Sequence, residues 1–294
     1  MINVLLQTTI EASSDDWSVD RFSYLRDFLS EVLDDEGNPS FRVTARNREK
    51  LGAPDSVLSN LRRSDFDEVW LFAVDTGDGL TIEDCQGITE FRKLGRGLMV
   101  TRDHMDLGSS VCGLGGVGAA HHFHSKNMDP DKSRRAIDDR LTTYISWPNY
   151  HSGANGDFQL VKAVGKPHPV LFDPSSATGL VRYLPSHPHE GSVSAPPKDS
   201  SARVILEGQS AASGANFNLA VAFEQSEDGG RAIAQSTFHH FTDFNWDPAA
   251  GSPSFVTELS GDAIKRTPAA LESTKRYVRN LAFWLANREV KAAV

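Results

Sequence analysis

The chain has 294 residues, of which 39% are hydrophobic, enough apolar material to bury a core. Its formal net charge of −9 argues against nucleic acid as a partner, because polyanion binding draws on clustered Lys and Arg. No apolar run approaches the roughly 20 residues of a membrane-spanning helix, and the amino terminus is typical of a strand instead of a secretory signal. We therefore expect a cytoplasmic protein with a small-molecule substrate and no membrane partner; a homo-oligomer is left open.

The first hundred residues alternate between strand and helix patterns. Apolar runs predict strands at residues 3–8, 41–45 and 68–74. Apolar residues at three- and four-residue spacings predict a helix at 18–33, and a capping box of Thr81 and Asp84 opens another at 81–93. Strands that alternate with helices pair in parallel, so this order predicts a doubly wound α/β sheet.

The most informative stretch is residues 97–127. Its first five residues predict a buried strand that ends in Arg102, Asp103 and His104, and open α/β sheets place their ligands at such carboxyl ends. A glycine-rich segment follows, and then three histidines, His121, His122 and His124.

The second half of the chain predicts further strands and a final helix. The strands are expected at residues 158–164, 203–206, 219–223 and 231–237, and the helix is expected to begin with Thr267 as N-cap and Pro268 at its first position. Two long loop insertions, at about 127–157 and 186–201, interrupt an otherwise single α/β domain spanning 1–294.

Most histidines follow strands or lie in turn-rich loops, which indicates a site. The two-apart pairs His122/His124 and His187/His189 could each present imidazoles to one side, and a carboxylate from Asp103, Asp106 or Asp243 could complete a zinc-type site. General acid/base chemistry by His104 or His239 without a metal is the alternative. For His104 the expected partner is Asp106 or Asp243, because Asp103 would point to the opposite side of an extended strand.

Other chemistries lack their motifs. No GxSxG nucleophile elbow follows the central strand, and the run Gly113–Gly118 does not directly follow a strand, which argues against NAD or FAD. Two cysteines, Cys85 and Cys112, form neither a disulfide framework nor a CxxC pair. Cys85 falls on the expected buried face of its helix.

Several segments together resemble a known family. They are GLMVTRDH, LGGVGAAH, KPHPVL, STFHH and the helix DTGDGLTIEDCQGITEFRKLGRGL, and they fall in the order seen in the ThuA-like (trehalose utilisation) branch of the class I glutamine amidotransferase-like superfamily. The resemblance implies a flavodoxin-like three-layer fold with a mostly parallel sheet. It also implies functional histidines at His104, His121 and His239. In the amidotransferases proper a Cys nucleophile follows the central strand, whereas here Asp103 and His104 hold that place and Cys112 lies further on.

The sequence thus predicts a small-molecule enzyme of the ThuA-like type with hydrolase-like or lyase-like chemistry, acting on a carbohydrate or other polar metabolite. The expected catalytic residues are His104, Asp106 and Asp243. The expected ligands of a divalent metal such as zinc are His121, His122, His124 and His239. Two alternatives stay open: an amidohydrolase or glutamine amidotransferase-like enzyme that uses Cys112, and a non-catalytic ligand-binding domain.

Overall fold

The computed structural model of the protein describes residues 1–135, 138 and 140–290. Its centre is an eight-stranded sheet with the strand order β2-β1-β3-β4-β12-β11-β10-β7. The five strands from β2 to β12 pair in parallel, and the other three extend the sheet in antiparallel fashion. In this order the strands are β2 (Phe41–Arg46), β1 (Ile2–Thr8), β3 (Glu68–Phe72), β4 (Gly97–Thr101), β12 (Ala232–Gln235), β11 (Asn216–Phe223), β10 (Ala202–Gln209) and β7 (Lys162–Ala163).

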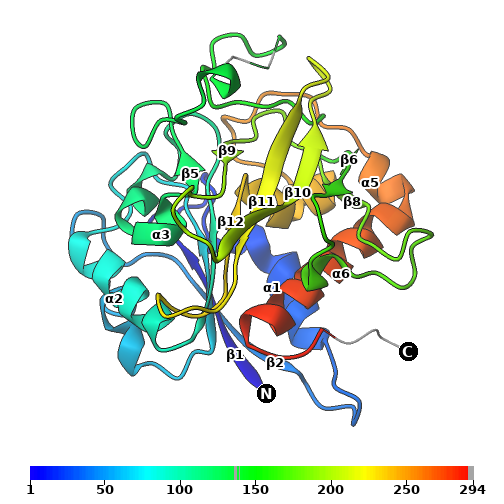
Figure 1. The fold of residues 1–294 in the computed structure, drawn as a ribbon. Helices are drawn as coiled ribbons and strands as arrows, with labels where there is room; N and C mark the ends of the chain where they lie inside the picture. Colours follow the sequence, from blue (N-terminus) through cyan, green and yellow to red (C-terminus); the bar gives the residue numbers. More distant parts are fainter. Residues whose placement is uncertain (136–137, 139, 291–294) are drawn as a thin grey trace.

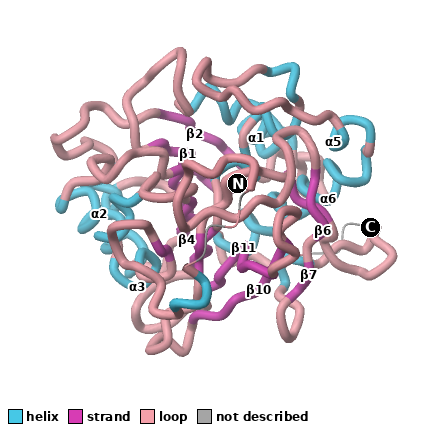
Figure 2. Tube along the Cα trace, turned by 90° about the horizontal axis from the view of Figure 1, so that it is seen from above, coloured by secondary structure: helices cyan, strands magenta, loops and turns pink. Residues whose placement is uncertain are grey.

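Helices cover both faces of the sheet. On one face α1 (Ser23–Glu31) and α6 (Pro268–Leu285) bury a core that includes Trp70 and Tyr277. On the other face α2 (Ile82–Lys93) buries a second core. Figure 1 shows α2 on one side of the sheet and α1 and α6 on the other, and Figure 2 shows the strands in a row between them. The fold is a flavodoxin-like α/β sandwich, as the sequence predicted.

Short elements make up the rest of the fold. Two small antiparallel sheets pair β5 (His121–His122) with β9 (Ser192–Val193), and β6 (Phe158–Leu160) with β8 (Tyr183–Pro185). The short helices are α3 (Gly115–Gly118), α4 (Asp243–Trp246) and α5 (Ala263–Arg266), and the 3-10 helices are η1 (Val19–Phe22), η2 (Leu58–Arg63), η3 (Ser109–Gly113), η4 (Lys132–Arg134), η5 (Pro169–Leu171), η6 (Phe238–Phe241) and η7 (Pro248–Ala250). Among the described residues, no helix combines the length and apolar character needed to cross a membrane.

Local predictions succeed where a cap or an apolar run is strong. The capping box of Thr81 and Asp84 is confirmed at the start of α2, and Cys85 is buried as expected. The single strand predicted over 158–164 is wrong. The chain leaves one sheet for another at the buried Val161, so β6 pairs with β8 whereas β7 pairs with β10. Thr267 precedes α6, but its side chain makes no capping hydrogen bond.

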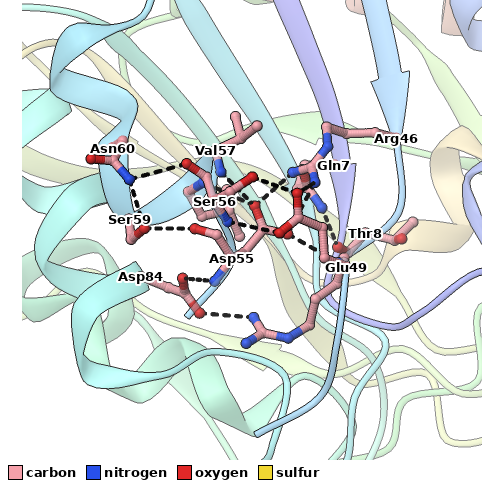
Figure 3. A network of polar contacts seen from close by, with 12 residues as sticks. Gln7, Thr8, Arg46, Glu49, Asp55, Ser56, Val57, Ser59, Asn60 and Asp84 are labelled. Carbon is pink, nitrogen blue, oxygen red and sulfur yellow. Dashed lines mark hydrogen bonds and ion pairs between the residues drawn. The ribbon is translucent and has the colours of Figure 1, made fainter. Parts of the chain in front are cut away.

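A buried ionic network holds the loop after β2 against the start of α2. The side chains of Arg48 and Asp84 are fully buried and form an ion pair of 2.8 Å. The other carboxylate oxygen of Asp84 accepts the backbone N–H of Asp55, and the Asp55 carboxylate pairs with Arg46 (Figure 3). Arg46 also donates to Gln7 at the end of β1. The network therefore fixes the loops at the carboxyl ends of the first two strands.

One long stretch of sequence interrupts the succession of parallel strands. β12 lies directly beside β4, yet residues 102–231 separate the two strands in sequence. This interruption carries the three antiparallel strands and the loop that contains His187 and His189. It includes the first predicted insertion, 127–157, of which residues 136, 137 and 139 lie outside the described part of the chain.

Candidate functional site

Three segments meet at the carboxyl ends of β4 and β12. Thr101 and Gln235, the last residues of these strands, are paired neighbours, so the segments that follow them begin side by side. The Phe238 N–H donates to the Arg102 carbonyl (3.0 Å), which ties η6 to the segment after β4. The loop from the long interruption approaches at Gly191, where a Cβ would lie 2.4 Å from the Asp103 carbonyl oxygen. Only glycine allows this approach without a shift of the backbone.

Asp103 is the centre of the resulting cluster. Its carboxylate lies 2.9 Å from His104 Nδ1, 3.4 Å from His187 Nε2 and 3.9 Å from His239 Nε2. The Thr237 hydroxyl donates to the same carboxylate (3.0 Å). Three imidazoles from distant parts of the chain therefore converge on one carboxylate that is only 2% exposed.

Two asparagines fix the orientation of His187 and His239. The Nδ1 atoms of these histidines lie 2.9 Å from the side-chain oxygens of Asn155 and Asn245, respectively. An amide oxygen only accepts hydrogen bonds, so each Nδ1 carries the proton. The Asn245 amide nitrogen in turn donates to Asn155 Oδ1, which supports this assignment of the two amides. Both Nε2 atoms are therefore left with lone pairs, and they lie 3.4 and 3.9 Å from the Asp103 carboxylate.

The protonation states favour the binding of a cation. Burial lowers the pKa of His187 to about 4 and that of His239 well below its usual value, so both rings are neutral near pH 7. Burial alone would raise the pKa of Asp103, but the neighbouring His187 and His104 hold it well below its usual range. A neutral imidazole and an ionised carboxylate are the forms that bind metal ions.

The ligand atoms are close enough to share one ion. Those of Asp103, His187 and His239 lie within 4.8 Å of one another, and so do those of His104, His187 and His189. Ligands about 2.1 Å from one metal lie roughly 3–3.5 Å apart, close to the distances seen around Asp103. His187 has only Nε2 to offer, so the two sets cannot bind two ions independently. The set with Asp103 fits better, because all three of its members are buried and both of its histidines are held by asparagines.

The cluster opens into a cleft of about 570 Å³. Its polar floor contains the histidines and Asp103, and its walls are largely apolar or aromatic. The lining residues are Asp16, Trp17, Val74, Thr76, Asp103, His104, Met105, Leu107, Tyr144, Ile145, Asn155, His187, His189, Phe238, His239, Phe255, Val256 and Glu258.

Of the histidines predicted as metal ligands, only His239 lies in this cleft. His121 is fully buried beside Phe123, and neither ring nitrogen has a hydrogen-bond partner among the described residues. Both nitrogens of His122 are engaged, by the Asn127 carbonyl and the Ser194 hydroxyl. His124 contacts the Trp147 carbonyl through Nδ1. These three histidines are therefore not brought together with His104 and His239.

The predicted catalytic residues are also separated. His104 lines the cleft, whereas Asp106 accepts the backbone N–H of Ser125, outside the lining. Asp243 caps α1 by accepting the backbone N–H groups of Ser23 and Tyr24. The expectation that Asp103 cannot orient His104 is wrong. β4 ends at Thr101, so Asp103 and His104 do not alternate as strand residues, and their side chains form a hydrogen bond.

The sequence patterns alone do not select His187, His189 or Asp103 as site residues. A two-apart histidine pair carries little information until the loop that bears it is placed beside the central strand. Asn155 and Asn245 were missed altogether. The one available signal was that Asn245 lies between Phe244 and Trp246, and that Asn155 lies in a turn-rich segment four residues after His151.

The fold and cluster define a flavodoxin-like α/β protein with an Asp- and His-lined cleft at the sheet edge. No protein family model matches the sequence, and neither does any curated protein. Solved structures similar to it include a ThuA-like protein from Parabacteroides merdae, at 14% identity, with 99% of this chain and 92% of that one covered and a TM-score of 0.49. The glutaminase domain of Trypanosoma brucei CTPS is similar at 13% identity over 92% of this chain and 94% of that one, with a TM-score of 0.43.

The carbohydrate deacetylase Agd3 is a third similar structure, at 12% identity and a TM-score of 0.42, over 85% of this chain but 30% of that one. The identities and TM-scores of these structures are too low to transfer an activity, so a function must be argued from the residues of this chain.

Proposed function

We propose that the protein is a metal-dependent enzyme with hydrolase-like chemistry on a small polar molecule. The observation that carries this proposal is the pair of Nδ1–asparagine hydrogen bonds, which leave the Nε2 atoms of His187 and His239 unprotonated near the Asp103 carboxylate. Ligand histidines in metal sites are commonly held through their second nitrogen in this way. A purely structural cluster would not need two neutral imidazoles aimed at one buried carboxylate.

The residues divide into two roles. Asp103, His187 and His239 would hold a divalent metal such as zinc, which when bound supplies Lewis-acid activation of a water or a carbonyl group. His104 is the acid/base group. Its Nδ1–H donates to Asp103, which leaves Nε2 to accept or return a proton in the cleft, and its 19% exposed side chain is accessible to a substrate. A carbohydrate or another polar metabolite fits a cleft with this polar floor.

The glutaminase-like alternative depends on Cys112, which is not among the cleft-lining residues. Burial raises the pKa of its thiol, so little reactive thiolate is present near neutral pH. Cys112→Ala should leave turnover nearly unchanged. A loss of several orders of magnitude would instead support thioester chemistry.

Metal analysis of purified variants tests the proposal. The wild-type protein should bind about one equivalent of zinc or another divalent metal, and His239→Ala and Asp103→Asn should reduce the bound metal to a small fraction. His122→Ala is the control, because it removes a buried imidazole outside the cleft and should retain the metal. Hydrolysis of a panel of acetylated sugars, esters and amides should follow metal content. Activity in metal-free protein would contradict the proposal.

A further inference from the structure

The cleft is lined by carboxylates together with four histidines, and His189 Nε2 lies 3.7 Å from the Glu258 carboxylate. Asp16, Asp103 and Glu258 contribute carboxyl groups to the lining, whereas neither Lys nor Arg contributes to it. A divalent metal held by Asp103 would offset only part of this charge. Asp16 and Glu258 would still disfavour a phosphate- or carboxylate-bearing molecule.

Aromatic side chains stand beside these carboxylates. Tyr144 and Phe255 line the cleft and are 78% and 57% exposed, so their rings are accessible to a ligand. Deeper in the cleft, the buried Trp17 packs its ring against His239, with centroids 4.6 Å apart. Aromatic faces combined with carboxylates are the recognition chemistry of organic cations.

A third observation indicates that the floor is built to receive a ligand. His187 lines the cleft, and its buried Nε2 makes no hydrogen bond with a described residue; the Asp103 carboxylate lies 3.4 Å away, and the metal of the proposed function would satisfy this atom. A buried polar atom without such a partner is costly unless a bound group satisfies it. The cleft therefore combines a polar floor, aromatic walls and two carboxylates beyond the metal ligand.

We propose that the substrate of this cleft carries an organic cation, an amine or a quaternary ammonium group, seated between Glu258, Asp16 and the aromatic side chains of Tyr144, Phe255 and Trp17. This inference rests on the proposed function in placing the reaction at the same cleft. The reacting part of the molecule would lie toward His104, and the cationic part toward the mouth.

The test compares probes of matched shape and different charge. Choline and its neutral isostere 3,3-dimethylbutan-1-ol are titrated by NMR, together with the anion 3,3-dimethylbutanoate. Choline cannot bind a metal through its quaternary nitrogen. We expect choline to bind about tenfold more tightly than the alcohol, and the anion to bind most weakly to metal-free protein. Equal affinities for choline and the alcohol, or tighter binding of the alcohol, would overturn the inference and favour a neutral ligand such as a sugar.

Variants assign the preference to the cleft. Glu258→Gln should weaken choline binding several-fold and leave the alcohol unaffected, because only the charge is removed. Glu272→Gln is the matched control, since this carboxylate lies on α6 with a 68% exposed side chain and is not among the cleft-lining residues. Phe255→Ala should weaken choline binding, whereas Leu259→Ala, which removes an exposed apolar side chain outside the lining, should not. An unchanged choline affinity in both Glu258→Gln and Phe255→Ala would overturn the assignment.

Titrations with and without metal separate this inference from the proposed function. A charge preference in a protein that binds no divalent metal would leave the cation inference standing and remove the metal-dependent function. Metal binding without a charge preference would leave the metal-dependent function supported and would overturn the cation inference.

Discussion

The imidazole rings of His187 and His239 stack face to face, with centroids 3.5 Å apart and an interplanar angle of 14°. Two protonated rings would repel each other at this distance, and burial lowers the pKa of both. The stack is therefore a pair of neutral bases. Asn155 and Asn245 hold the Nδ1 atoms of the two rings, and the Nε2 atoms lie near the Asp103 carboxylate.

The asparagines should control metal affinity through the rings that they hold. Asn245→Ala removes the acceptor for His239 Nδ1, so the ring can adopt the other tautomer or rotate, and metal affinity should fall by about 10- to 100-fold. The measurement is a competition titration with a chelating dye. Asn280→Ala is the control, because Asn280 is also buried but donates to carbonyls beside α6. An equal loss of affinity in both variants would mean that the effect is general destabilisation.

His104 should be needed for turnover but not for stability or metal binding. His104→Gln keeps a polar side chain but cannot exchange a proton at the pH of catalysis, so kcat should fall by about 10²- to 10⁴-fold. The melting temperature and metal content should stay close to wild type, because the residue lines the cleft and contributes little to the core. His124→Gln, outside the cleft, should retain activity. Substantial activity in His104→Gln would assign His104 to substrate positioning alone.

Buried neutral histidines should make the fold sensitive to mild acid. Burial lowers the pKa of His168 from 6.5 to about 3, and its ring packs against Trp284. Between these two values the unfolded chain binds a proton that the folded chain does not, so stability falls as the pH drops below 6.5 and is unaffected above it.

One such histidine contributes at most about 1.4 kcal/mol per pH unit in this window. Urea unfolding at pH 7, 6 and 5 measures the slope, and His168→Gln should reduce it. An unchanged slope in His168→Gln would show that other buried histidines, such as His121, account for the acid sensitivity.

The Arg48–Asp84 pair should be a major stabilising contact. Arg48→Met leaves the Asp84 carboxylate buried without its charged partner and should lower the free energy of unfolding by about 3–5 kcal/mol. The exposed pair of Arg62 and Glu90 is the control, and Arg62→Met should cost about 1 kcal/mol or less. Chemical denaturation of the two variants gives the comparison, and similar losses would contradict this view of the network.

The sequence predicted the sheet well because its signals were local. The capping box at Thr81 and the continuous apolar run of β4 determine their elements whatever surrounds them. The position of β12 beside β4 was not predicted, since residues 102–231 separate the two strands and no periodic pattern links them.

The site was harder to predict, because its residues come from segments that are far apart in the sequence. His104 and His239 follow strands, and the rule that ligands gather at carboxyl ends was sufficient to select them. His121 follows a glycine-rich segment but belongs to β5, which pairs with β9 and buries the ring away from the cleft. His187 enters the cluster only because its loop approaches the Asp103 carbonyl, just after β4, at Gly191. The spacing of residues in the sequence does not predict this approach of the loop.

The central claim is that Asp103, His187 and His239 bind one divalent metal ion. Anomalous diffraction at the zinc edge, from crystals grown with one equivalent of zinc, tests it most directly. The account predicts a single strong peak about 2.0–2.2 Å from His187 Nε2, His239 Nε2 and an Asp103 carboxylate oxygen. A peak at His121, His122 or His124, or no peak within reach of Asp103, would contradict it.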